Sequence, residues 1–366
     1  MEYYALYIIL GSLSILTIYV PKKQKILPAL IGAVFILLFQ ALRWRTGTDW
    51  LAYYNGFIYS ILSPNEQFEL GFIKLNQIIR YISDSYTVFL FVECGLNLLF
   101  IILFLNKFCQ QNPILGLIYF FVTSIFPIRY TLALSIVLYS YTYIYNKDLV
   151  KFCTLIIIAF LIHRSVIIFV PFYFLCRKTY SIKILFLIYF ISIILGYASN
   201  FTFGYIIRLA VGLYGGMGDV VQSKMDSYIS GEIPDYAKMT PFRYLLSIVN
   251  STFFIILFYY YKRKYFLYNP KYNILFNLYV FGISYNRLIV QIVPDFARLT
   301  SLFCGGFIIM IIMIISKYSK RNQIALFSVV LLYLFAIYNS EIKGIYRDLY
   351  MPYFSIFSPI ERTHVY

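Results

Sequence analysis

Runs of apolar residues, separated by short polar connections, recur from one end of the chain to the other. Runs of this length and composition are typical of helices that cross a lipid bilayer. The pattern predicts an all-α polytopic membrane protein with about twelve transmembrane or broken helices, in one integral-membrane domain over residues 1–366. The runs lie near residues 3–20, 26–42, 86–105, 113–126, 132–145, 152–162, 165–176, 184–199, 244–260, 273–290, 299–316 and 324–338.

Two neighbouring pairs of runs are too short to cross a bilayer as straight helices: 113–126 with 132–145, and 152–162 with 165–176. A helix of about 14 residues reaches roughly 21 Å, whereas the hydrocarbon core is about 30 Å thick. Basic residues flank the second pair on both sides, so one continuous helix there would place a basic flank outside the cell. We therefore predict that each pair forms a hairpin or a broken helix.

The tips of these hairpins carry charge at a depth where charge is rare. The first tip is Pro127-Ile128-Arg129-Tyr130, and the second is His163-Arg164-Ser165. Irregular backbone below the membrane surface is tolerated only where it lines a protein or water cavity. Ionisable residues at that depth are therefore candidates for function. Glu93, inside the run 86–105, is expected to be either protonated or paired with an arginine.

Composition and charge fit this class. Hydrophobic residues make up 61% of the chain and charged residues 13%, against about 45–50% and about 25% in soluble domains. The positive-inside rule places the Lys-rich connections in the cytoplasm and both termini outside. The net charge of +16 then follows from topology, and no nucleic-acid partner is needed to explain it. The basic residues of these connections are Lys22, Lys23, Lys25, Lys107, Lys147, Lys151, Arg177, Lys178, Lys183, Lys262, Arg263, Lys264, Lys271, Lys317, Lys320 and Arg321.

Most arginines fall outside those connections, on the side predicted to be extracytoplasmic. Arginine presents a planar fork that binds phosphate or carboxylate through two hydrogen bonds, and lysine does not. An anionic ligand on the outer face would explain the enrichment, and pairing with outer acidic residues is the alternative. The five cysteines lie in or beside apolar runs and include no CxxC pair, so we expect neither disulfides nor a thiolate metal site.

Two outer loops are long, 43–85 and 200–243. In the first, Glu66–Ser83 repeats apolar residues at helical spacing, which predicts an amphipathic helix at the membrane interface. The predicted apolar face consists of Phe68, Phe72, Leu75, Ile79 and Ile82. The second loop contains the glycine-rich segment Tyr214–Asp219, which lacks the preceding strand and the GK[ST] ending of a phosphate loop. We therefore expect a linker or lid there.

The densest polar segment is Ala41–Trp50, which follows an apolar run and contains both tryptophans of the chain. Two interpretations are open, an aromatic and basic belt at the membrane interface or a binding loop. Trp44, Trp50 and Tyr53 can stack on sugar faces or anchor the chain at the interface.

The outer side offers arginines, one deep histidine and an aspartate as reactive groups. It contains no HExxH motif, no Cys/His cluster and no DxD-type metal pair, so we expect no metal and no cofactor. Arginines suit the binding of a pyrophosphate and its stabilisation as a leaving group. Asp49 or His163 can take a proton from an attacking hydroxyl. The outer arginines singled out are Arg43, Arg45, Arg129, Arg164, Arg287 and Arg298.

The polar segment resembles the signature of the EpsG family of bacterial exopolysaccharide proteins, which is related in role to Wzy O-antigen polymerases. The signature is an arginine, three residues, Gly-Thr-Asp, and a tyrosine four residues later; here these are Arg43, Gly47-Thr48-Asp49 and Tyr53. Tyr130 departs from the family pattern, where glutamine is common, and Arg45 occupies a variable position. Further motifs follow in family order: Glu69-Leu70-Gly71-Phe72 with Leu75-Asn76, Ile128-Arg129 with Ala133, Phe160-Leu161-Ile162-His163-Arg164-Ser165, Ala297-Arg298-Leu299 and Met351-Pro352-Tyr353.

The resemblance implies a membrane glycosyltransferase of GT-C-like architecture in the bacterial plasma (inner) membrane, which polymerises the repeat units of a surface polysaccharide. Such proteins act on the extracytoplasmic face and transfer an oligosaccharide from one polyprenyl (undecaprenyl) pyrophosphate to another lipid-linked unit. The implied partners are this lipid-linked oligosaccharide and membrane lipid, with room for a chain-length regulator and a flippase. The expected roles are catalysis by Asp49 and His163, pyrophosphate binding by Arg43, Arg45, Arg129, Arg164 and Arg298, and sugar binding by Trp44, Trp50, Tyr53 and Glu69.

Other functions stay open on the residues alone. A flippase or transporter of lipid-linked sugars also needs arginines and a cavity, but it must expose a polar path to both sides, whereas the charges here cluster on the outer half. A ligase or other lipid-linked sugar transferase is chemically close to a polymerase. A membrane acyltransferase is a weaker alternative that rests on the single intramembrane histidine.

Overall fold

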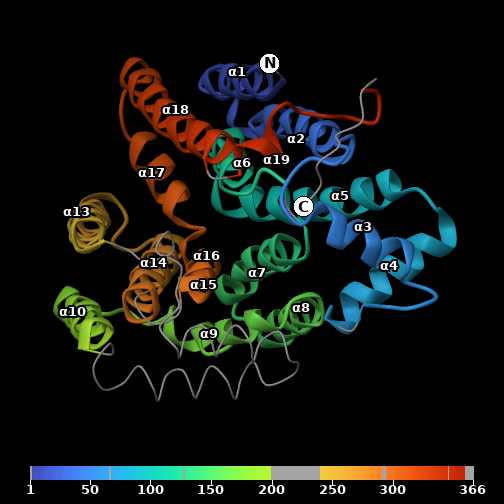
Figure 1. The fold of residues 1–366 in the computed structure, drawn as a ribbon. Helices are drawn as coiled ribbons and strands as arrows, with labels where there is room; N and C mark the ends of the chain where they lie inside the picture. Colours follow the sequence, from blue (N-terminus) through green and yellow to red (C-terminus); the bar gives the residue numbers. More distant parts are fainter. Residues whose placement is uncertain are drawn as a thin grey trace. The chain divides into compact units, whose positions relative to one another are not determined.

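Helices dominate the protein in its computed structural model, which describes residues 2–65, 67–126, 128–198, 240–290, 294–344 and 346–358 (Figure 1). Five helical segments in this part of the chain are long and apolar enough to cross a membrane, and five shorter apolar helices accompany them. The helical, membrane-type fold predicted from the apolar runs is confirmed. The exact number of spans and the GT-C-like architecture stay predictions.

The chain forms two compact units, Met1–Ile167 with Ile311–Tyr366 (unit 1) and Ile168–Met310 (unit 2). Two elements, η2 (Arg164–Phe169) and α17 (Phe307–Ile315), run across the boundaries. The other elements of unit 1 are α1 (Glu2–Leu16), η1 (Lys22–Gln24), α2 (Ile26–Ala41), α3 (Trp50–Ile58), α4 (Leu70–Ile82), α5 (Tyr86–Phe108), α6 (Pro113–Thr123), α7 (Arg129–Asn146), α8 (Leu149–Ile162), α18 (Lys320–Lys343) and α19 (Arg347–Tyr350). Those of unit 2 are α9 (Phe172–Leu175), α10 (Ile182–Ala198), α13 (Pro241–Tyr265), α14 (Pro270–Ile289), α15 (Pro294–Ala297), η3 (Arg298–Thr300) and α16 (Ser301–Cys304).

Local sequence explains where α6, α7 and α8 begin and end. Asn112 accepts a backbone N–H of the first turn of α6 at 3.2 Å, and Pro113 occupies a position that needs no N–H partner. Asp148 caps α8 in the same way at 3.0 Å. Helix α7 ends at Asn146, and the left-handed conformation of its C-cap Lys147 is common at helix C-termini. The α7–α8 turn therefore falls where the sequence predicted a Lys-containing connection.

The interior of unit 1 forms around α5 and α7, and α2 and α6 pack on α5. Aromatic rings interlock there, and Phe104 of α5 meets Tyr141 of α7 edge to face with their centroids 5.5 Å apart. Both side chains are fully buried. The Asn112 amide donates to Ser14 O at 3.1 Å, which ties the start of α6 to α1. The reactive groups described below sit at one end of this framework.

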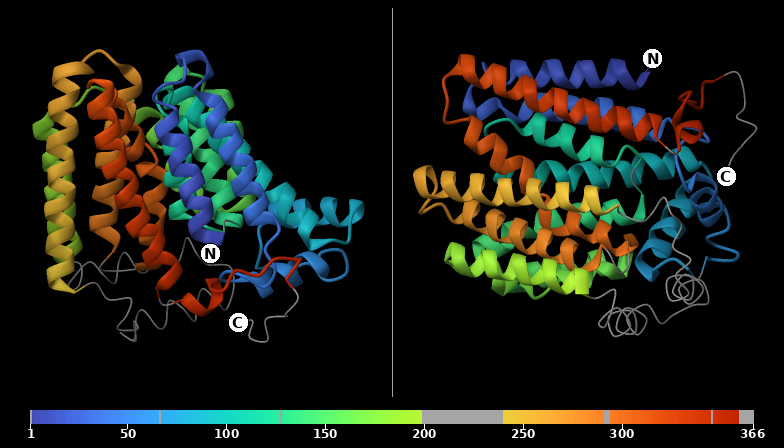
Figure 2. Two further views of the ribbon diagram at one scale, coloured as in Figure 1. Left: turned by 90° about the horizontal axis from the view of Figure 1, so that it is seen from above. Right: turned by 60° about the vertical axis from the view of Figure 1, so that its left-hand side comes forward.

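Helices α3 and α4 pack on α5, and α4 also contacts α8. Within unit 1, α3 and α4, the start of α1 and the segment after α18 lie at the same end (Figure 2). Helix α4 confirms the helix predicted within Glu66–Ser83. It buries only part of the predicted apolar face, because Phe72 and Ile79 are buried while Ile82 is 79% exposed. The expected position at a membrane interface stays a prediction.

The chain breaks at both predicted hairpin tips. Helix α6 ends at Thr123 and α7 begins at Arg129, while α8 ends at Ile162 and the short 3₁₀ helix η2 follows it. The structure divides two of the predicted runs further. Residues 165–176 form η2 and α9, and residues 299–316 form η3, α16 and α17. How deep the tips lie in a membrane stays a prediction.

Unit 2 is organised around α14, which packs against both α10 and α13. Arg287 of α14 joins α13 through hydrogen bonds to Ser247 Oγ (2.6 Å), Ser247 O (2.8 Å) and Ser251 Oγ (2.6 Å). Polar bonds of this kind hold helices together where no water competes. The glycine-rich segment Tyr214–Asp219 of the second predicted loop lies outside the described residues.

Candidate functional site

The signature loop, Arg43–Asp49, is held in place by the C-terminal segment, Leu349–Ile356. The N–H groups of Trp44 and Gly47 donate to carbonyl oxygens of this segment at 2.9 Å and 2.8 Å. Arg43 also forms an isolated antiparallel bridge with it. Two motifs that lie near opposite ends of the sequence, the Gly-Thr-Asp motif and the terminal Pro-Tyr motif, are therefore neighbours in the fold.

The backbone of the signature loop is strained. Arg45, Gly47 and Asp49 have φ angles of 47°, 101° and 57°, in the left-handed region. A Cβ atom at Gly47 would also lie 3.0 Å from the ring of Phe126. Non-glycine residues in this region cost about 1–3 kcal/mol each and persist only where the surroundings hold them. The bonds to the C-terminal segment provide that support, so the loop geometry is built into the fold.

Arg43 is an almost fully buried charge, with 1% of its surface exposed. Its guanidinium lies over the ring of Phe126, 4.6 Å from the centroid. Within the described part of the chain, its Nε and Nη1 have no hydrogen-bond partner. Buried polar groups are normally satisfied, and an unsatisfied charge is costly. Among the described residues, Arg43 therefore provides a positive charge whose Nε and Nη1 are not hydrogen-bonded.

Glu93 of α5 is an acidic group within electrostatic range of Arg43. Its side chain is fully buried, and Oε1 has no hydrogen-bond partner among the described residues. The buried hydroxyl of Tyr86, also on α5, lacks one too and lies within range of both charges. The predicted alternatives for Glu93 were protonation or pairing with an arginine. No hydrogen-bonded pair with Arg43 forms, so the two groups interact through space.

The two tryptophans pack into one aromatic cluster beside the loop. Trp50 stacks on Tyr54 with a centroid distance of 4.8 Å and an interplanar angle of 13°, and Trp44 meets Trp50 edge to face at 5.1 Å. Trp50 is only 2% exposed, so its ring faces are used inside the protein. Sugar stacking by Trp44 and Trp50 stays a prediction, and Trp44 is the more accessible of the two.

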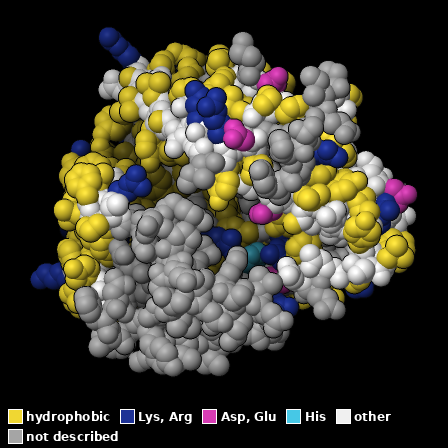
Figure 3. Space-filling model, viewed as in Figure 1, with side chains coloured by type: hydrophobic (Ala, Val, Ile, Leu, Met, Phe, Trp, Pro, Cys, Tyr) yellow, Lys and Arg dark blue, Asp and Glu magenta, His cyan; other side chains and the backbone are white. Residues whose placement is uncertain are grey.

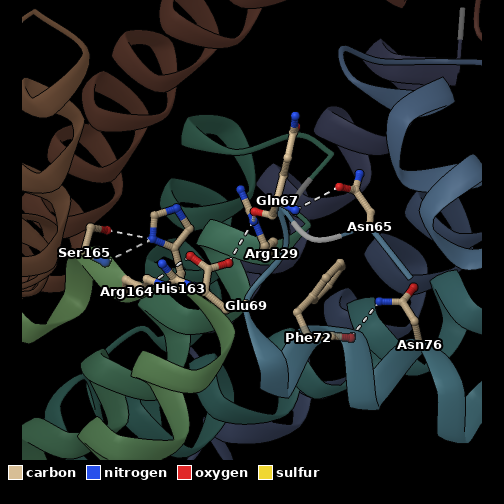
Figure 4. Close-up of polar contacts among 9 residues, drawn as sticks. All are labelled: Asn65, Gln67, Glu69, Phe72, Asn76, Arg129, His163, Arg164 and Ser165. Carbon is tan, nitrogen blue, oxygen red and sulfur yellow. Dashed lines mark hydrogen bonds and ion pairs between the residues drawn. The ribbon is translucent and has the colours of Figure 1, made fainter. Parts of the chain in front are cut away.

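Arg129, at the first position of α7, lies in a second charged cluster (Figure 4). Its Nη1 donates to Glu69 Oε2 at 2.8 Å and to Gln67 O at 3.1 Å. The guanidinium also covers the ring of Phe68 at 5.0 Å. Its Nε is buried without a partner among the described residues. A guanidinium at a helix N-terminus places two sources of positive potential together, which favours an anion there.

Glu69 connects three parts of unit 1. One carboxylate oxygen accepts from Arg129, and the other, Oε1, accepts the backbone N–H of Arg164 at 3.1 Å (Figure 4). The residue is 9% exposed. The start of α4 lies close to the end of α8 at Gly71. A Cβ atom there would lie 2.7 Å from Leu161 O, so only glycine allows this approach. The Glu-Leu-Gly-Phe motif thus brings the start of α4 onto the end of α8, next to the His163 tip.

His163 is the C-cap of α8, and its ring is oriented by Ser165. The Ser165 hydroxyl lies 2.7 Å from Nδ1, and the Ser165 backbone N–H donates to the same nitrogen at 3.4 Å. Because a backbone N–H can only donate, Nδ1 acts as an acceptor, and the proton of the neutral ring is on Nε2. Tyr130 packs edge to face against the ring at 5.2 Å. His163 is thus arranged to donate a hydrogen bond through Nε2.

The hydroxyl of Tyr53 is affected by charges of both the signature loop and the Arg129 cluster. Burial raises the pKa of its hydroxyl, while the nearby Arg129 guanidinium opposes that rise. Asp49 and Glu93 also act on it. Asp49 itself is exposed and precedes α3 without capping it through its side chain. The hydroxyl of Tyr53 therefore lies within electrostatic range of Arg129, Asp49 and Glu93.

The structure brings some predicted site residues together and leaves others apart. Glu69 accepts from both Arg129 and the backbone N–H of Arg164, and so connects the two tips that the sequence analysis singled out. Figure 3 shows a histidine side chain flanked by basic and acidic side chains on one face. Arg298 belongs to unit 2, where its side chain is exposed. The side chains of Arg45 and Arg164 are partly and largely exposed.

Sequence reasoning missed several members of these clusters. The roles of Ser165 and Gln67 were not predicted, although the position of Ser165 two residues after the histidine was a usable signal. The involvement of Tyr86 and of the C-terminal segment could not be read from a local motif. Within the described residues, no group of three or more His, Cys, Asp or Glu side chains could hold a metal ion. Independently of this, the guanidinium of Arg129 at the start of α7 favours an anion there.

The comparison with protein families agrees with the motifs. A model of the EpsG family matches residues 3–355, which is nearly the whole chain. No curated protein and no solved structure matches the chain significantly.

Proposed function

The chain belongs to the EpsG family, and from this premise we propose that it is a membrane glycosyltransferase that polymerises oligosaccharide repeat units carried on a polyprenyl pyrophosphate. A hydroxyl of the acceptor's terminal sugar attacks the reducing-end carbon of the donor. A glycosidic C–O bond forms, and the bond between that carbon and the pyrophosphate oxygen breaks. The lipid pyrophosphate leaves with the electron pair, and the hydroxyl proton passes to a base.

The pair of buried or half-buried arginines in unit 1 is the observation that carries this proposal. Arg43 is a buried charge whose Nε and Nη1 have no partner among the described residues. Arg129 begins α7, and the next residue, Tyr130, packs on the ring of His163. A departing pyrophosphate gains negative charge, and fixed positive groups stabilise it most where water is excluded. Arg129 contacts the pyrophosphate in this scheme, while Arg43 acts through its uncompensated charge.

Other residues of the site take supporting roles in the scheme. His163 donates from Nε2 to a pyrophosphate oxygen, because Ser165 occupies Nδ1. Arg45, Arg164 and Arg298 remain proposed pyrophosphate ligands. Tyr53 and Trp44 are proposed to contact sugar, together with Trp50 and Glu69 as predicted from the family motifs. Asp49, exposed beside α3, is a candidate to orient the acceptor hydroxyl.

We place the reaction on the extracytoplasmic side of the bacterial plasma membrane. Within unit 1, the start of α1, the helices α3 and α4 and the segment after α18 lie at one end (Figure 2). The lysines of η1 belong to the connection at the other end of α1. The positive-inside rule assigns that connection to the cytoplasm, and so supports an external site.

Incubation of the purified protein with one synthetic lipid-linked repeat unit tests the function. We expect a ladder of products that differ by one repeat unit, together with free polyprenyl pyrophosphate. A single addition would instead show a ligase or single transferase. Movement of the lipid between leaflets with no covalent product would show a flippase, and either outcome would overturn the polymerase proposal.

A further inference from the structure

Glu69 is the carboxylate at the centre of the Arg129 cluster. A role in sugar binding alone does not explain the two contacts that its oxygens make with the protein. Both of its oxygens are engaged by the protein, one by the Arg129 guanidinium at 2.8 Å and one by the Arg164 N–H at 3.1 Å. At 9% exposure it is too enclosed for an ordinary surface ion pair. It is therefore the counter-ion of the arginine that the proposed reaction needs for the donor.

A pyrophosphate that binds Arg129 has to compete with Glu69. The Arg129 Nη1 that holds Glu69 also holds Gln67 O at 3.1 Å, whereas its buried Nε is unpartnered among the described residues. A carboxylate and a pyrophosphate cannot share one guanidinium without like-charge repulsion. Binding of the donor therefore changes the environment of Glu69.

We propose that the donor's pyrophosphate displaces Glu69 from Arg129, and that the released carboxylate is the base that takes the acceptor's proton. The inference rests on the proposed glycosyl transfer and names its base. The acceptor O–H bond breaks as the new glycosidic bond forms, the proton ends on a Glu69 oxygen, and the electron pair of the broken donor bond leaves with the lipid pyrophosphate. The base is then available only when a donor is bound.

Two features make Glu69 better suited than the other candidates. The Arg164 N–H can keep one carboxylate oxygen in place after Arg129 lets go of the other. The anionic pyrophosphate beside it favours protonation of the carboxylate, as any nearby negative charge does. His163 already accepts hydrogen bonds at Nδ1 and carries its neutral-state proton on Nε2. Asp49 is exposed at the start of α3, where bulk water competes for its proton.

The Glu69→Gln variant tests this with two opposite readouts. The amide can still accept the Arg164 N–H, but it neither neutralises Arg129 nor takes a proton. We expect kcat of polymerisation to fall about 10²–10⁴-fold, the usual contribution of a general base. The dissociation constant of a prenyl pyrophosphate, measured against the matching prenyl alcohol as a blank, should fall by about fivefold because its competitor is gone.

Asp84 provides the matched control, since it pairs with Arg80 in an exposed ion pair at the end of the same helical segment. Asp84→Asn should change neither readout. Glu69→Asp, which keeps the charge, should bind the prenyl pyrophosphate as the wild type does and retain part of kcat, and it replaces Glu69→Gln if that variant does not fold.

Two results would overturn the proposal. One is a Glu69→Gln enzyme that keeps the kcat of the wild type. The other is a Glu69→Gln enzyme that binds the prenyl pyrophosphate more weakly, which is expected if Glu69 only positions Arg129. The proposal would also be overturned if Glu69→Asp lost as much affinity for the prenyl pyrophosphate as Arg129→Gln does. If the wild type itself does not bind the prenyl pyrophosphate or form a ladder, the polymerase function is refuted. That outcome can be told apart from a failure of the Glu69 proposal, which concerns only the variants.

Discussion

Arg43 of unit 1 and Arg287 of unit 2 are both buried, at 1% and 5% exposure, but their surroundings differ. Arg287 has three hydrogen bonds of 2.6–2.8 Å to two serines of the neighbouring helix, made by both of its Nη atoms. Its Nε has no partner among the described residues, and its guanidinium lies 5.6 Å from the ring centroid of Tyr244. Arg43 lies on an aromatic ring, and its Nε and Nη1 have no partner among the described residues. The difference lies at the Nη atoms: both Nη atoms of Arg287 bond the neighbouring helix, whereas Nη1 of Arg43 has no partner among the described residues.

The contrast shows that two buried arginines of one chain can differ in how many of their hydrogen-bond donors the fold uses. Arg287 is a helix-to-helix bond, of the kind that small polar residues make between membrane helices. Arg43 is kept in a strained loop that the C-terminal segment holds, and such strain is typical of functional sites. The two residues therefore make opposite predictions for activity and stability.

Loss of the Arg43 charge should have the largest effect on activity. Arg43→Gln keeps a polar side chain of similar reach but removes the uncompensated charge, so we expect kcat of polymerisation to fall about 10²–10³-fold. Arg43→Lys keeps the charge and should retain more activity. The rate of ladder formation per folded molecule measures both. Equal loss in the two variants would mean that the guanidinium shape, and not its charge, is what Arg43 contributes.

Arg298→Lys extends the comparison to an exposed arginine of unit 2. If Arg298 binds the pyrophosphate through its planar fork, a point charge cannot replace it. We expect the rate of chain extension to fall roughly 10-fold or more, as one weakened leaving-group contact requires. Product length on a gel is the measurement. Near-wild-type chains from this variant would leave the arginines of unit 1 as the only pyrophosphate ligands in the scheme.

The sequence predicted the helices and marked the arginines, but it did not predict which arginine finds hydrogen-bond partners. Apolar periodicity and caps such as Asn112 and Asp148 are local, so the helices and their breaks at Arg129 and His163 could be predicted. Motif order also marked Arg43 and the Gly-Thr-Asp segment. Whether an arginine finds a partner depends on residues far away in sequence. Ser247 is 40 positions from Arg287, and Glu69 is 60 from Arg129, and nothing local specifies either pairing.

Asp49→Asn should have a smaller effect than the arginine variants. The side chain is exposed and does not cap α3, so removing its charge should not disturb the fold. As an acceptor-orienting group it should contribute roughly 10-fold to kcat/KM for the acceptor, as one hydrogen bond to a charged group does. Titration of the acceptor at saturating donor measures this. A drop in the amount of folded protein in the membrane, with normal activity per molecule, would make Asp49 structural.

Arg287→Gln should leave catalysis intact and change only stability. The variant loses hydrogen bonds between α14 and α13, although Ser247 Oγ still donates to Tyr244 O at 2.7 Å. We expect a loss of about 1–2 kcal/mol in the free energy of unfolding, seen as a lower melting temperature in detergent, with kcat per folded molecule unchanged. Arg43→Gln should instead lower kcat and leave the melting temperature unchanged, so the two variants separate activity from stability. If Arg287→Gln instead lowers kcat with no change in melting temperature, hydrogen-bond satisfaction does not separate structural from functional arginines in this protein.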